Sequence, residues 1–161
     1  ATEIWEKVHG REHPLVATVL NNRAGLLRKQ GEYDEADPLC RRAAEINAKL
    51  LGPDHPRVAT DLNSRALLLE KQGRYAEADP LYQRALAINE KVLGPDHPSV
   101  ASILNNRAGL LSAQGKHDEA IPLMERAAAI RMEKLGEGRP HTVRIQKRLE
   151  DERNKQEAPK G

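Results

Sequence analysis

Residues 13–38 read HPLVATVLNNRAGLLRKQGEYDEADP. The same pattern returns as HPRVATDLNSRALLLEKQGRYAEADP at residues 55–80 and as HPSVASILNNRAGLLSAQGKHDEAIP at residues 97–122. The copies lie 42 residues apart; residues 14–55 agree with 56–97 at 29 of 42 positions, and 56–97 agree with 98–139 at 21 of 42. Self-similarity at such a period indicates a stack of equivalent structural units. We therefore predict three full repeats, residues 14–55, 56–97 and 98–139.

Each repeat reads as two helices joined by a short turn. A proline opens the first helix, because its fixed φ and missing N–H suit the first helical turn, and a glycine ends the helix. These prolines are Pro14, Pro56 and Pro98, and these glycines are Gly31, Gly73 and Gly115. The second helix runs to a further glycine, which is Gly52, Gly94 or Gly136. The predicted fold class is all-α, built from antiparallel helix pairs.

The second repeat carries small and aromatic residues at a characteristic spacing: Ala66, then Gly73-Arg-Tyr75-Ala-Glu-Ala78, then Tyr82 and Ala85-Leu86. In these residues the chain resembles the tetratricopeptide repeat family, whose commonest unit is about 34 residues long. The 42-residue form is similar to the repeats of kinesin light chains and of NB-ARC-type signalling ATPases. The resemblance implies a right-handed superhelical solenoid, and a scaffold that binds a peptide or helix of another protein in a concave groove lined by the first helices.

The two ends of the sequence depart from the full repeats. Residues 1–10 align with residues 43–52, which predicts the second helix of a truncated preceding repeat. Its apolar residues Ile4, Trp5 and Val8 would lack a neighbour, so we expect end-to-end self-association through this edge.

Residues 140–156 are predicted to form a capping helix, and residues 157–161 a tail. Polar residues replace the apolar residues of the second repeat along this helix, and such a polar outer face is what a terminal repeat needs. The replacements are Gln146, Glu150, Glu152 and Arg153 in place of Leu62, Ala66, Leu68 and Leu69.

The polar side of the first helices is where the resemblance places a partner. Asparagine recurs there at Asn21, Asn63 and Asn105, although it is a poor helix former, so we expect a ladder of amides that binds an extended peptide backbone. The alternative is that duplicated sequences simply repeat harmless residues. The expected partner-binding residues are Thr18, Asn21, Asn22, Arg28, Lys29, Thr60, Asn63, Ser64, Lys71, Ser102, Asn105 and Asn106.

Arginine recurs near the centre of the apolar side of the first helices, at Arg23, Arg65 and Arg107, where the family more often has leucine. A buried guanidinium needs an acceptor, so we expect these arginines to be structural. The first candidate acceptors are Glu35, Glu77 and Glu119; the second are Trp5, by stacking, Asn47 and Asn89. The alternative is that the arginines hold an anionic partner.

The sequence contains no recognisable catalytic motif, and we expect neither an enzyme, nor a cofactor, nor a metal site. His13, His55 and His97 would lie about 8–10 Å apart in successive layers, whereas a zinc ion needs ligands within about 2.1 Å, so we interpret them as turn residues. Cys40, the single cysteine, is expected in the core. No apolar segment resembles a signal or a membrane span, which favours the cytoplasm.

The runner-up function is binding of nucleic acid or another polyanion through basic groove residues such as Arg28, Lys29 and Lys71. It is the weaker hypothesis because Lys and Arg outnumber Asp and Glu by only 26 to 24, which gives a net charge of +2.

Overall fold

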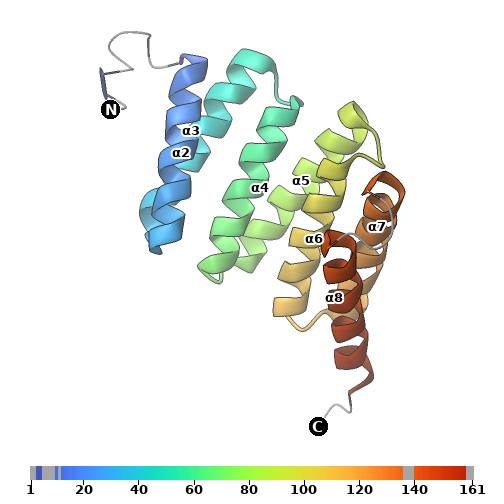
Figure 1. Cartoon of the computed structure of the whole chain (residues 1–161). Helices are drawn as coiled ribbons and strands as arrows, with labels where there is room; N and C mark the ends of the chain where they lie inside the picture. The colour runs from blue at the N-terminus through green and yellow to red at the C-terminus, as the bar shows by residue number, and fades with distance from the viewer. Residues whose placement is uncertain (1–2, 5–9, 11, 136–139, 159–161) are drawn as a thin grey trace. The chain divides into compact units, whose positions relative to one another are not determined.

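The computed structural model describes residues 3–4, 10, 12–135 and 140–158 (Figure 1). They form two compact units, Ala1–Ile88 and Asn89–Gly161, and each is described here by itself. The helices are α2 (Pro14–Gln30), α3 (Tyr33–Leu51), α4 (Pro56–Lys71), α5 (Tyr75–Leu93), α6 (Pro98–Ala113), α7 (His117–Leu135) and α8 (Pro140–Glu157). Each predicted first and second helix is therefore present, and strands are absent from the described residues. Trp5 and Val8 of the predicted N-terminal edge lie outside the described residues, whereas Ile4 is 69% exposed.

A histidine caps the start of each first helix. The ring Nδ1 accepts a hydrogen bond from the backbone N–H two residues later, at 3.2 Å for His13, 3.1 Å for His55 and 3.1 Å for His97. The proline that follows each histidine takes the first helical position, where its missing N–H costs nothing. The histidines therefore have the turn role expected from the sequence.

The glycines between the helices are required by their backbone conformation. Gly31, Gly73 and Gly115 have φ values of 83°, 74° and 75°, a region that residues with a side chain rarely adopt. The turn from each first helix to its second helix therefore has the same geometry in all three repeats.

Small residues allow the helices of the first unit to pack closely. Val16, Ala17 and Leu20 of α2 pack against Ala43 and Ile46 of α3. A second cluster joins Ala24, Ala36, Cys40 and Leu68, from α2, α3 and α4. Cys40 is 2% exposed, so its predicted place in the core is confirmed.

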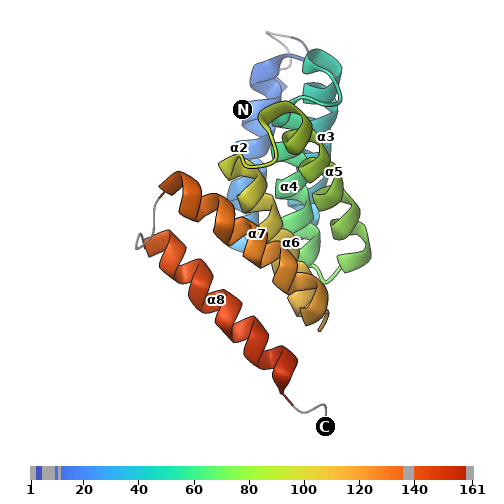
Figure 2. The ribbon, with the colours of Figure 1, turned by 90° about the vertical axis from the view of Figure 1, so that its right-hand side faces the viewer.

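In the second unit, α8 lies beside α7 (Figure 2). Ile145 is buried, and Leu149 packs against a cluster of Ala108, Leu111, Ala120 and Met124. The opposite face carries the exposed residues Val143, Gln146, Glu150 and Arg153. The helix thus has a buried apolar side and an exposed, mostly polar side, and its role as a cap stays a prediction.

Glu152 contradicts its predicted place on the polar side of α8. It is 3% exposed and faces α6 and α7. Its carboxylate accepts hydrogen bonds from Ser112 Oγ at 2.5 Å and Lys155 Nζ at 2.8 Å, and lies 2.7 Å from His117 Nδ1. Burial alone would raise the pKa of Glu152, but these hydrogen bonds, from Lys155, Ser112 and His117, outweigh it and lower the pKa to about 2. A helical wheel could not show this, because two of the three polar neighbours, Ser112 and His117, come from other helices.

We expect Glu152→Gln to lower stability in a pH-dependent way. The folded-state pKa is below the ordinary value of 4.5, so the carboxylate contributes its full stabilisation above about pH 4.5 and loses it as the pH falls toward 2. Urea denaturation between pH 3 and 7 measures the difference between wild type and variant, which should shrink on acidification. Glu150→Gln, at an exposed position of the same helix, is the control. Equal, pH-independent effects of the two substitutions would contradict the assignment.

Candidate partner-binding groove

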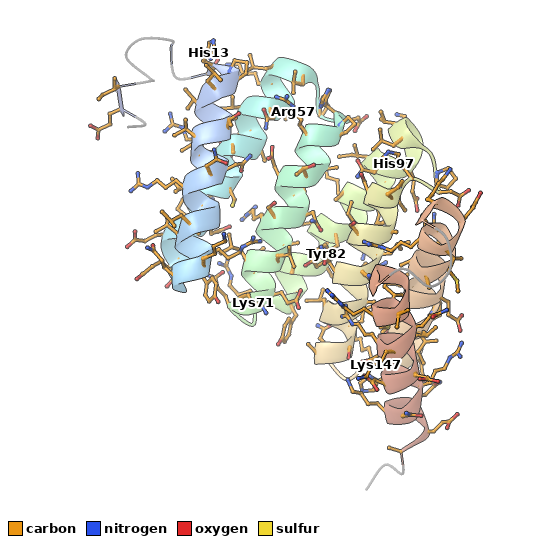
Figure 3. All side chains as sticks on the ribbon, viewed as in Figure 1. His13, Arg57, Lys71, Tyr82, His97 and Lys147 are labelled. Carbon is orange, nitrogen blue, oxygen red and sulfur yellow. The ribbon has the colours of Figure 1, made fainter. Side chains whose placement is uncertain are left out.

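In the first unit, the predicted binding residues lie on α2 and α4, and Figure 3 shows Arg57 and Lys71 near opposite ends of α4. Thr18, Asn22, Lys29, Thr60 and Lys71 are exposed. Asn21, Arg28, Asn63 and Ser64 are half-buried. The sequence pattern therefore places most of this set where a partner can reach it.

Two cavities lie along this face and share Asn21. One, of about 210 Å³, is lined by Thr18, Asn21, Asn22, Asn47, Arg57, Thr60 and Asp61. The other, of about 130 Å³, is lined by Asn21, Ala24, Gly25, Arg28, Cys40, Ser64 and Leu68. Lys29, Asn63 and Lys71 line neither of them. We call these two cavities, with the residues that line them, the α2–α4 groove.

A carboxylate that the sequence analysis did not single out organises the groove. Asp61 is 2% exposed, and it accepts one hydrogen bond from Asn21 Nδ2 and another from Asn47 Nδ2, each at 2.6 Å. Burial raises the pKa of Asp61, and the bonds from Asn47 and Asn21 and the charge of Arg57 oppose that rise. One amide hydrogen of Asn21 is thus bonded inside the protein. Its carbonyl oxygen and its second amide hydrogen are the groups that can bind a partner.

Cys40, at the floor of the second cavity, offers no reactive thiolate. Its burial, followed by the nearby charges of Asp37 and Asp61, raises the pKa of the thiol to about 11. The thiol therefore stays protonated at neutral pH and acts as a small apolar residue.

The recurring arginines differ from one another. Arg65 Nε donates to Asp37 Oδ1 at 2.6 Å, and the two side chains are 20% and 15% exposed. The expected acceptors are therefore wrong for Arg65, because Glu35 points to solvent, Glu77 binds Arg74 at 2.7 Å, and Asn47 binds Asp61. Arg23 is exposed, which contradicts its expected burial, and Arg107 is half-buried. Trp5, the stacking candidate, lies outside the described residues.

In the second unit, the predicted residues Ser102, Asn105 and Asn106 are half-buried on α6. A cavity of about 200 Å³ at the start of α6 is lined by Pro98, Ser99, Ser102, Arg131 and Lys134. Ser102 Oγ donates to the Pro98 carbonyl at 3.3 Å and accepts a bond from Arg131 Nη2 at 3.0 Å. Arg131 and Lys134 were not among the predicted residues, because they lie on the second helix of the repeat.

No group of three or more His, Cys, Asp or Glu side chains in the described part of the chain is arranged to hold a metal ion. Among the helices described, none is both long enough and apolar enough to cross a membrane.

Comparison with known proteins agrees with the repeat pattern. A family model described as tetratricopeptide repeat matches residues 1–37, 15–78, 60–133 and 99–151. No curated protein sequence matches the chain.

Solved structures with similar folds include the nearly identical TPR-like repeats of a Podosopora anserina protein assigned as a kinesin light chain. Its sequence is 26% identical, and the TM-score is 0.80. The match covers 89% of this chain and 68% of that one. BtubC (BKLC) from P. vanneervenii gives 25% identity and a TM-score of 0.76, over 89% of this chain and 59% of that one. A TPR-like protein from Chlorobium tepidum gives 24% identity and a TM-score of 0.66, over 88% and 94% of the two chains. The predicted all-α solenoid fold is therefore confirmed.

Proposed function

Because the chain belongs to the tetratricopeptide repeat family, whose members generally serve as scaffolds for protein–protein interaction, we propose that it binds an extended segment of a partner protein along the α2–α4 groove. Polar residues of α6, in the second unit, would contact the same kind of segment. A non-enzymatic role is typical of proteins with this fold.

One observation supports this proposal most strongly: the two cavities of the groove meet at Asn21. An extended peptide presents one N–H and one C=O at each residue. An asparagine amide offers both a donor and an acceptor, so Asn21 and Asn22 can bind peptide backbone without requiring a particular side chain.

Asp61 prepares the groove for this task. A carboxylate that holds Asn21 at 2.6 Å fixes the rotamer of that side chain before a partner arrives. A side chain ordered in advance loses less conformational entropy on binding. We therefore regard Asp61 as a positioning residue of the groove.

The experiment selects peptides from a random display library on the immobilised protein and measures their affinity by isothermal titration calorimetry. Asn22→Ala should leave the melting temperature close to that of the wild type, because Asn22 is exposed. It should weaken a selected peptide by about two- to tenfold, the equivalent of one hydrogen bond. Glu45→Ala, at an exposed position of α3, is the matched control and should leave the affinity unchanged.

The outcome that contradicts the proposal is a set of selected peptides whose affinity is insensitive to Asn22→Ala. The polyanion hypothesis is tested beside it with a single-stranded oligonucleotide at 50 and 200 mM salt. Phosphate contacts would produce a steep loss of affinity. The buried carboxylate of Asp61 in the groove argues against such binding.

A further inference from the structure

The cavity at the start of α6 carries two positive charges. Arg131 and Lys134 both line it, together with the hydroxyl-bearing residues Ser99 and Ser102. The first turn of α6 contains no acidic residue. Arg131 makes its described hydrogen bond to a neutral hydroxyl, Ser102 Oγ, rather than to a carboxylate.

One hydrogen-bond donor beside this cavity lacks an acceptor among the described residues. The Nε atom of Arg131 is buried and has no hydrogen-bond partner in the described part of the chain. A buried donor without an acceptor destabilises the folded protein, and more so on a charged group. An acceptor supplied from outside would remove that destabilisation.

The repeat register indicates which acceptor is missing. Arg131 stands where Asn47 stands in the first repeat, and Ser102 stands where Thr18 stands. In the first unit, Asn47 and Thr18 line a cavity that also contains the carboxylate of Asp61, to which Asn47 donates at 2.6 Å. The residue of α8 that corresponds to Asp61 is Ile145, which has no acceptor.

We propose that this cavity, formed by Ser99, Ser102, Arg131 and Lys134, binds an oxyanion of a partner protein, either a carboxylate or a phosphate. The proposal rests on the proposed function and deepens it by adding an acidic feature to the partner. Arginine binds both oxyanions through charge-assisted hydrogen bonds, and the hydroxyl of Ser99 is a neutral donor beside it. The ligand oxyanion supplies Arg131 with an acceptor, as the Asp61 carboxylate does for Asn47 in the first unit.

The direct test uses inorganic phosphate and acetate as probes, titrated into the whole protein at constant ionic strength made up with chloride. Nuclear magnetic resonance follows the Nε–H signal of Arg131 and the backbone amides of Ser99 and Ser102. We expect saturable shifts at these positions. Arg131→Asn, which introduces the residue found at positions 47 and 89, should weaken binding about tenfold or more.

The matched control is Arg144→Asn, which removes the same charge from an exposed position of α8. Melting curves confirm that both variants are folded. The proposal is overturned if no saturable shift occurs, or if Arg144→Asn weakens the anion as much as Arg131→Asn does.

A second arm separates the two proposals. In peptides selected on the immobilised whole protein, each acidic residue is changed in turn to its amide, and a phosphoserine version is compared with the carboxylate version. If peptide binding depends on Asn22 but the peptides bind the Arg131→Asn variant as tightly as wild type, the anion-site proposal is wrong and the groove proposal is supported. If small anions bind at Arg131 while no peptide is selected, the anion site is supported and the groove proposal fails.

Discussion

Deletion of residues 140–161 is expected to lower the thermal midpoint by roughly 10 °C and to cause aggregation. The deletion removes α8, so Ala108, Leu111 and Met124 lose the cover that Leu149 provides. Burial of each large apolar side chain is worth about 1.5–3 kcal/mol, and α8 contributes both Ile145 and Leu149. For a domain of this size about 3 kcal/mol or more corresponds to that change in midpoint. Circular dichroism melts and light scattering measure the two effects.

A pair of single substitutions in α8 tests the same interpretation without shortening the chain. Ile145 is 6% exposed, and Ile145→Ala should cost about 2–4 kcal/mol in the free energy of unfolding. Val143 is 51% exposed, and Val143→Ala should change stability by about 0.5 kcal/mol or less. An unchanged midpoint after the deletion, or equal effects of the two substitutions, would rule out a capping role for α8.

We expect Arg65→Ala to destabilise the protein by about 2–3 kcal/mol, because it leaves Asp37 half-buried without its closest cation. The cost stays below that of a fully buried pair, since Arg74 Nη1 lies 3.9 Å from Asp37 Oδ2 and keeps part of the compensation. Arg65→Leu should cost less than Arg65→Ala because it fills the space. Urea denaturation gives the free energies.

Arg23 provides the matched control, because it occupies the same position of the first repeat and is exposed. Arg23→Ala should therefore cost about 0.5 kcal/mol or less. The double variant Asp37→Ile with Arg65→Leu should recover much of the loss, since it removes the charge together with its partner. If Arg65→Ala melts like wild type and loses the partner peptide instead, the arginine belongs to the binding surface.

The helices were predictable because their boundaries depend on local chemistry. The proline after each histidine and the glycine at each turn act within a few residues, and both recur every 42 residues. The same repetition shows which helix positions are buried, as the complete burial of Ala66 and Ala108 illustrates.

The hydrogen-bond partners of the polar residues were harder to predict, because the repeat comparison draws attention only to residues that occur at the same position in several repeats. Asp61 stands where the other repeats have Val19 and Ile103, so its role in the α2–α4 groove left no repeated trace. Glu152 likewise replaces a leucine, and the donors that hold it, Ser112 and His117, lie on two other helices.

One pairing did leave a signal in the sequence. The position of Asp37 is filled by Asp79 in the second repeat and by Ile121 in the third. The position of Arg65, one repeat further along, is filled by Arg107 and then by Leu149. The two positions change from charged to apolar together, whereas the position of Glu35 stays glutamate throughout. This joint change points to Asp37 as the acceptor.

The contact between Arg65 and Asp37 also sets a rule for the order of the repeats. Repeats 14–55 and 56–97 each have an aspartate at the position of Asp37 and an arginine at the position of Arg65, so a further copy of either would retain both members of the pair. Repeat 98–139 has Ile121 at the position of Asp37, so a repeat inserted after it would bring an arginine without that carboxylate. A designed array is therefore best lengthened with copies of repeat 14–55 or 56–97 placed ahead of repeat 98–139.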